Sequence, residues 1–144
     1  MTTIDDLACK IECSDLLVRL CSALDEGRNQ DAAGMFTVDA CIHTPGGEVL
    51  EGSAAHGFLE RRPASIATRH IMSNLLVTPT GVGAATATAY ILVYRVPRSE
   101  GDTLPRVLPG TPQAAGDWSI DLTKTASGWK ISRYAASPVL EPAK

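Results

Sequence analysis

His70 is the side chain in this sequence whose chemistry is most informative. It lies in residues 67–78, a stretch typical of a β-strand, where alternate side chains point to opposite faces. We therefore expect His70, Met72, Asn74 and Leu76 on one face. An imidazole titrates near neutral pH, so it can take a proton from the carbon next to a carbonyl and return it to a leaving hydroxyl. His70 is the candidate catalytic residue, and the alternative is a structural histidine that bonds across the sheet.

Several other side chains are candidates for binding a substrate. The hydroxyl of Tyr90 is suited to donate to a substrate oxygen as negative charge develops there. Trp118 is a second aromatic candidate, although both rings are equally suited to ordinary core packing. Met72 and Asn74 are included because they should share the face of His70. His43 lies on an earlier strand and supplies a second imidazole only if it faces inward.

The four cysteines do not form a recognisable ligand set. Cys9 and Cys13 are four residues apart and share a face of a helix, but no CxxC pair or nearby histidine completes a metal site. We expect small buried thiols and no metal. Cys21, Cys41 and Ser22 lack an adjacent base, and a nucleophile without a base is not activated.

Helical spacing dominates the first part of the chain. One helix is expected from Ile4 to about Glu26, with an apolar stripe that starts at Ile4, Leu7 and Ile11 and ends at a terminating Gly27. A second helix is expected over 29–36, and a third from Ser53 through Arg62, ahead of Pro63. These helices alone do not enclose a site.

Strand patterns follow. A hairpin is expected over 40–51, two long strands over 67–78 and 83–96, and a closing pair over 117–125 and 128–136. A loop, 97–116, connects the strand over 83–96 to the strand over 117–125. It is rich in proline (residues 97, 105, 109 and 112) and glycine. Loops of this length are uncommon in compact domains and are either functional or tolerated surface insertions. Helices followed by strands indicate an α+β fold with a mostly antiparallel sheet.

Four segments together resemble the SnoaL-like family of the nuclear transport factor 2-like superfamily. They are Ala23-Leu24-Asp25-Glu26-Gly27-Arg28, Met35-Phe36-Thr37-Val38-Asp39-Ala40, Thr68-Arg69-His70-Ile71-Met72-Ser73-Asn74 and Gly128-Trp129-Lys130-Ile131-Ser132-Arg133. The resemblance covers about residues 4–136 of a single domain, 1–144. It implies a cone-shaped barrel in which a strongly curved sheet and three helices enclose one pocket. It also implies no cofactor, and a homo-oligomer that is a dimer or a trimer.

Relatives implied by the resemblance include scytalone and bile-acid dehydratases, polyketide cyclases, ketosteroid isomerases and non-catalytic binders. In such dehydratases the histidine that matches His70 faces the cavity, and an acidic residue follows three positions after the one that matches Asp25. Here that position is Arg28, so we expect His70 to lack the usual carboxylate. Arg28 either lines the pocket and binds an anionic substrate, or lies at a solvated helix junction. Asp25 and Asp39 are expected to cap elements or pair with arginine, without a catalytic role.

Charge and composition limit the classes of function. The formal net charge is −3, which argues against a general nucleic-acid binder, because such proteins need a basic stripe. The N-terminus lacks the features of a signal peptide, and no window has the roughly 18 apolar residues of a membrane span. We expect a cytoplasmic protein with a small-molecule partner.

Its function is predicted to be that of a cofactor-independent lyase or isomerase, dehydratase- or cyclase-like, acting on a hydrophobic carbonyl or polyketide-like compound. The alternative is a non-catalytic binding or assembly protein.

Overall fold

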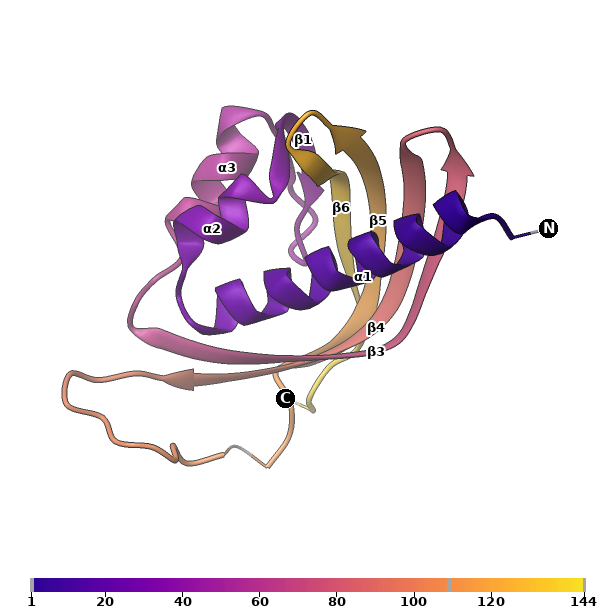
Figure 1. Cartoon of the computed structure of the whole chain (residues 1–144). Coiled ribbons are helices and arrows are strands. Elements are labelled where there is room, and N and C mark those ends of the chain that lie inside the picture. Colours follow the sequence, from indigo (N-terminus) through magenta and orange to yellow (C-terminus); the bar gives the residue numbers. More distant parts are fainter. Residues whose placement is uncertain (1, 109, 144) are drawn as a thin grey trace.

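A six-stranded sheet curves around three helices in the computed structural model, which describes residues 2–108 and 110–143 (Figure 1). The strand order is β2-β1-β6-β5-β4-β3, and every neighbouring pair is antiparallel except β1 and β6. The helices are α1 (Ile4–Asp25), α2 (Asn29–Gly34) and α3 (Ser53–Glu60). The strands are β1 (Phe36–His43), β2 (Val49–Glu51), β3 (Ile66–Gly81), β4 (Ala84–Pro97), β5 (Ala114–Thr125) and β6 (Gly128–Leu140). The predicted α+β fold with a mostly antiparallel sheet is therefore confirmed.

The sheet is open, so the predicted barrel is not closed. β2 and β3 form its two edges, and β2 is only three residues long. β2 and β3 do not pair with each other, and the helices cover the concave face (Figure 1). The site therefore lies between the sheet and the helices.

The first helix begins where its capping residues predict. Thr3 accepts a hydrogen bond from the backbone of Asp6 and Asp6 accepts one from the backbone of Thr3, which satisfies otherwise free N–H groups. The expected apolar stripe is wrong in the first half of α1, where Ile4, Leu7 and Ile11 are exposed. The buried face there carries Cys9 and Cys13, because α1 crosses the sheet on that side.

Small side chains on β4 allow α1 to lie close to the sheet. Ala85, Ala87 and Ala89 are buried at every second position, as the alternating sequence predicts. They belong to the core with Leu17 and Leu20 of α1. This core holds α1 against the sheet, where the helix packs mainly on β3, and so it helps to set the position of residues at the end of α1.

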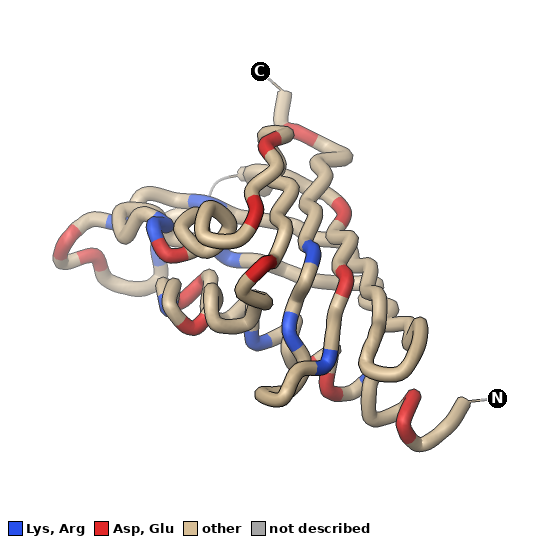
Figure 2. Tube along the Cα trace, turned by 90° about the horizontal axis from the view of Figure 1, so that it is seen from above, with Lys and Arg blue, Asp and Glu red and all other residues tan. Residues whose placement is uncertain are grey.

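The long loop connects β4 and β5, which are antiparallel neighbours as expected. It leaves the ends of these strands and extends beyond the sheet (Figure 1). Pro109, one of the loop prolines, lies outside the described residues. Basic and acidic positions are interspersed along the described trace (Figure 2). No helix among the described residues is long and apolar enough to cross a membrane.

Candidate active site

A cavity of about 610 Å³ opens between the concave face of the sheet and the helices. This volume is in the range of ordinary small-molecule sites. Its walls are largely apolar, with contributions from α1, α3 and the strands β4, β5 and β6. His70 and Trp118 both line it, as two of the predicted site residues.

His70 forms a buried pair with Asp25. Its Nδ1 lies 2.6 Å from Oδ1 of Asp25, and its backbone N–H donates to Oδ2 of the same carboxylate at 2.9 Å. Thr68, two residues earlier on the same face of β3, donates its hydroxyl to Oδ1 at 3.0 Å. The side chains of His70 and Asp25 are only 9% and 7% exposed. Three hydrogen bonds therefore fix one carboxylate against one imidazole.

The position of Asp25 follows from the way α1 ends. Asp25 is the last helical residue, and Gly27 reverses the chain with a positive φ of 70°. Because α1 packs across β3, its C-terminal end comes beside the start of that strand. The carboxylate thus meets a histidine that is 45 residues away in the sequence.

Burial raises the pKa of Asp25, but the hydrogen bonds from the ring and backbone of His70 and from Thr68, with the charge of His70, outweigh it. The net effect lowers the pKa of Asp25 below its ordinary value. The carboxylate is therefore ionised at neutral pH, and Nδ1 of His70 must carry the proton that it shares with Asp25. The remaining ring nitrogen, Nε2, has no hydrogen-bond partner among the described residues and is free to exchange a proton with a ligand.

The expectation that His70 lacks a carboxylate partner is wrong. Asp25 itself supplies the carboxylate, so the replacement at position 28 does not remove it. Arg28 is bonded instead to Glu26 and Asp31 on the surface, and it is absent from the cavity lining. A carboxylate at a helix end commonly caps locally, but the contacts of Asp25 are to residues more than 40 positions away.

Tyr134 is a candidate that the sequence reading did not single out. It lies on β6 and lines the cavity beside Trp118, with ring centroids 5.3 Å apart, and Trp118 in turn lies 6.2 Å from His70. Burial raises the pKa of Tyr134, so its hydroxyl remains protonated and able to donate. No strand pattern marks it, because residues on both faces of β6 near Tyr134 are at least partly buried.

The other predicted binding residues lie outside this cavity. Met72 lines a smaller hollow on the far side of the pair, together with Asp25 and His70. Asn74 and Tyr90 are exposed, and His43 is partly buried at the end of β1 without lining the cavity. The alternation predicted from His70 to Leu76 is wrong beyond Ser73, where a bulge reverses the faces. Asn74 has a positive φ of 52° there, and Leu76 points outward.

His56 lies outside the cavity, and its Nε2 is 2.9 Å from the carbonyl oxygen of Thr37, in a partly buried contact between α3 and β1. No group of three or more histidine, cysteine, aspartate or glutamate side chains within residues 2–108 and 110–143 is arranged to hold a metal ion. Burial raises the pKa of the Cys13 thiol to about 12, and Cys9 beside it adds to the effect.

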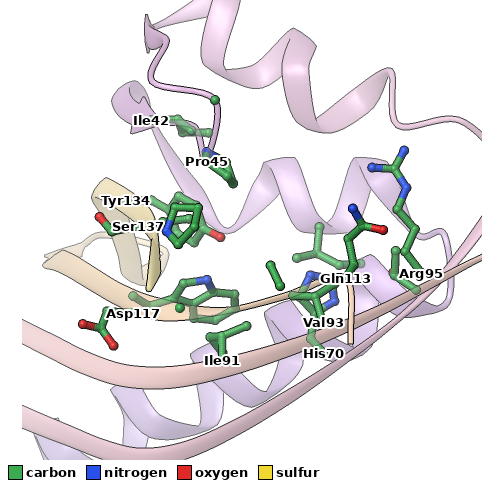
Figure 3. Close-up of a pocket in the computed structure, with 18 of the residues that line it drawn as sticks. Ile42, Pro45, His70, Ile91, Val93, Arg95, Gln113, Asp117, Tyr134 and Ser137 are labelled. Atoms are coloured by element: carbon green, nitrogen blue, oxygen red, sulfur yellow. The ribbon is translucent and has the colours of Figure 1, made fainter. Parts of the chain in front are cut away.

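The pair and the cavity together supply the groups that general acid/base chemistry requires. A carboxylate orients the imidazole, an unpartnered ring nitrogen lines an apolar cavity, and a protonated phenol lies in the same cavity. Figure 3 shows Tyr134 and His70 apart along this cavity, with Tyr134 near Ser137 and His70 near Val93. Such a site can move a proton between two positions of one bound molecule.

Comparison with known proteins identifies relatives of the whole domain. Residues 5–135 match the SnoaL-like domain. No curated protein matches the sequence.

Similar solved structures cover almost the whole chain. A scytalone dehydratase candidate from Novosphingobium aromaticivorans is 17% identical, with a TM-score of 0.76 over 94% of this chain and 87% of that one. A dehydratase candidate of the nuclear transport factor 2-like family from Streptomyces avermitilis is also 17% identical, with a TM-score of 0.74 over 90% and 95%. A protein from Catenulispora acidiphila is 25% identical, with a TM-score of 0.71 over 93% and 94%. These likenesses establish the fold.

Proposed function

Because the chain belongs to the SnoaL-like domain family, we propose that it is a cofactor-independent dehydratase or isomerase that uses His70 as its general acid and base. The substrate class is a hydrophobic carbonyl or polyketide-like compound. The observation that carries the proposal is the His70–Asp25 pair, whose imidazole lines an apolar cavity of about 610 Å³. Two of the similar solved structures are described as dehydratase candidates, which supports this reaction class.

The proposed reaction begins with proton removal. Nε2 of His70 takes a proton from the carbon next to the substrate carbonyl, and the electrons of that C–H bond form an enolate. The imidazolium is stabilised by the ionised Asp25, 2.6 Å from Nδ1. The hydroxyl of Tyr134 donates to the enolate oxygen, where the negative charge develops.

The second step returns the proton. As the enolate carbonyl re-forms, the electron pair closes a carbon–carbon double bond and the β-hydroxyl leaves, taking the proton from Nε2 and departing as water. In an isomerase the same proton is returned to a different carbon, and nothing leaves. His70 ends each cycle in its starting state, so the reaction needs no oxidant, reductant or cofactor.

Dehydration of hydroxy-ketones tests the proposal. A panel of aromatic and alicyclic β-hydroxy ketones is incubated with the protein, and the conjugated product is followed by its ultraviolet absorbance. We expect turnover of at least one compound, and a decrease of about 10²–10⁴-fold in His70→Asn. We expect Tyr134→Phe to decrease kcat by about 10²–10³-fold. Equal turnover by His70→Asn and the parent protein, with circular dichroism unchanged, would exclude the proposed role of His70.

We also propose that the protein forms a homo-oligomer, either a dimer or a trimer. In support, the outer face of β3 and β4 exposes Ile71, Leu76, Tyr90 and Leu92. Apolar residues gathered on one sheet face are commonly covered by a partner. Size-exclusion chromatography with light scattering measures the mass directly, and a mass of 15.2 kDa would contradict this proposal.

A further inference from the structure

Two arginines lie at one end of the cavity beside His70. Arg62 follows α3 and Arg95 lies near the end of β4, and both line the cavity as well as an adjoining hollow. Figure 3 shows Arg95 and Gln113 at the end of the cavity opposite Asp117. The cavity therefore carries two arginines at one end and Asp117 at the other, whereas Glu141 follows the end of β6 level with Ala114, toward the arginine end.

Neither guanidinium has a carboxylate partner. No carboxylate oxygen of the described residues lies within 4.0 Å of Arg62 or Arg95, whereas surface Arg28 has two such partners. The hydrogen bond that Arg62 makes is to the neutral hydroxyl of Thr68, at 3.3 Å. Burial lowers the pKa of Arg62, and the positive charge of Arg95 acts in the same direction. Arg62 is partly buried and Arg95 is exposed, so the cost of an unpaired charge falls mainly on Arg62, and an anion bound there would offset it.

The carboxylates in the vicinity do not meet this need. Asp25 attracts Arg62 through its charge, but its two oxygens are occupied by His70 and Thr68. Glu48 lines the adjoining hollow and Glu141 follows β6 level with Ala114; both are exposed, and neither is within 4.0 Å of Arg62 or Arg95. The protein thus leaves guanidinium groups directed at space that a ligand can fill.

The remainder of the cavity requires an apolar ligand body. Between the arginines and the opposite end, the lining is formed by aliphatic and aromatic side chains, among them Leu24, Ile91, Val93 and Trp118. A ligand that satisfies both regions has an aromatic or alicyclic body and an anionic group at one end. A planar carboxylate matches a guanidinium because it accepts two parallel hydrogen bonds.

We propose that Arg62 and Arg95 bind a carboxylate of the substrate, so that the substrate class is an aromatic or alicyclic keto acid. This inference rests on the proposed function and deepens it. The carboxylate anchors one end of the molecule, and the apolar body lies along Trp118 with its carbonyl directed at Tyr134. The anchor fixes which carbon faces His70, and it distinguishes acids from neutral ketones of the same shape.

A binding experiment tests the anchor without requiring turnover. Naphthalene-1-carboxylate and the uncharged naphthalene-1-carboxamide have the same ring and nearly the same shape. Isothermal titration calorimetry at about pH 7 measures the affinity of each for the parent protein, for Arg95→Gln and for Arg133→Gln. Arg133 is a matched control, because it is a partly exposed arginine on β6 that does not line the cavity.

We expect the carboxylate to bind the parent protein about tenfold more tightly than the carboxamide. Arg95→Gln should remove most of this preference without weakening the carboxamide, and Arg133→Gln should leave both affinities unchanged. Arg62→Gln serves as the second variant, and it too should weaken only the carboxylate. Raising the salt concentration should decrease the preference, because the attraction is between charges.

Two results would overturn the anchor. One is equal affinity of both naphthalene compounds for the parent protein. The other is a loss in Arg95→Gln that is the same for acid and amide. Because no reaction is measured, the anchor can fail while hydroxy-ketone turnover succeeds, and it can hold while turnover fails.

Discussion

The central residue-scale feature is a carboxylate that acts through an imidazole. Asp25 does not touch the cavity; it fixes the ring of His70 through Nδ1 and leaves Nε2 available. This is a positioning role, and its strength depends on the ionised state of the carboxylate. The hydrogen bonds that lower the pKa of Asp25 favour that state at neutral pH.

The pH dependence of stability follows from that shift. The pKa of Asp25 is lower in the folded protein than its ordinary value of 3.8, so its ionised form stabilises the fold above that value. The contribution disappears as the pH falls through the folded-state pKa. Urea denaturation should therefore show a gap between the parent protein and Asp25→Asn that is widest near neutrality and narrows below about pH 4. A gap that stays constant from neutral to acidic pH would contradict this account of Asp25.

At this scale the sequence points to residues whose own side-chain type carries the chemistry, and their roles stay predictions. His70 and Trp118 are candidates because of their side-chain type, and both line the cavity. Asp25, Tyr134 and Arg62 were not assigned to the site, because their roles depend on contacts across long stretches of chain. The resemblance did mark Asp25 as a recurrent position, and that was the one available signal for it.

At the scale of elements, the decisive feature is the bulge in β3. The order of helices and strands was predicted correctly, with boundaries that differ by a few residues. The bulge between Ser73 and Leu76 was not predicted, and it moves Asn74 and Leu76 away from the face of His70. A single extra residue reverses every later side chain, and a sequence pattern with polar and apolar residues on both faces does not reveal it.

Asn74 should therefore matter for the backbone rather than for a ligand. Its φ of 52° is a conformation that glycine and asparagine tolerate and β-branched residues do not. We expect Asn74→Gly to fold as stably as the parent protein, and Asn74→Val to lose about 1–2 kcal/mol of unfolding free energy. Thr78→Val, at an exposed position of the same strand, is the control. If Asn74→Val proved as stable as Asn74→Gly in thermal denaturation, the strained conformation would be disproved.

The first helix shows a second limit of pattern reading. Its bounds were predicted almost to the residue, but the buried face of its first half was not. Apolar residues lie on more than one side of this half, and the face that packs is selected by the sheet beneath it. Ile4, Leu7 and Ile11 are exposed for this reason.

At the scale of the whole molecule, the open sheet and the helices enclose the site without help from the long loop. Of the described residues between β4 and β5, only Gln113 lines the cavity, and the remainder are mostly exposed. The sequence left two alternatives for this loop, a functional segment or a tolerated insertion. The position of its described residues favours the insertion.

Shortening the loop distinguishes the two alternatives. We expect replacement of residues 101–110 by a short glycine–serine linker to change the unfolding free energy by no more than about 1 kcal/mol, because closure entropy varies slowly with loop length. Ligand affinity measured by calorimetry should also be retained. A large loss of affinity with stability intact would show that the loop covers the cavity.

The most direct measurement of the central claim is hydrogen exchange at the carbon next to a carbonyl. Bicyclic ketones and keto acids are dissolved in deuterium oxide, and the loss of their α-proton signals is followed by nuclear magnetic resonance. The account predicts that the parent protein accelerates exchange of at least one compound, that Asp25→Asn accelerates it less, and that His70→Asn removes about 10²–10⁴-fold of the acceleration. Exchange no faster than in buffer across the panel, or equally fast with His70→Asn, would contradict proton transfer by His70.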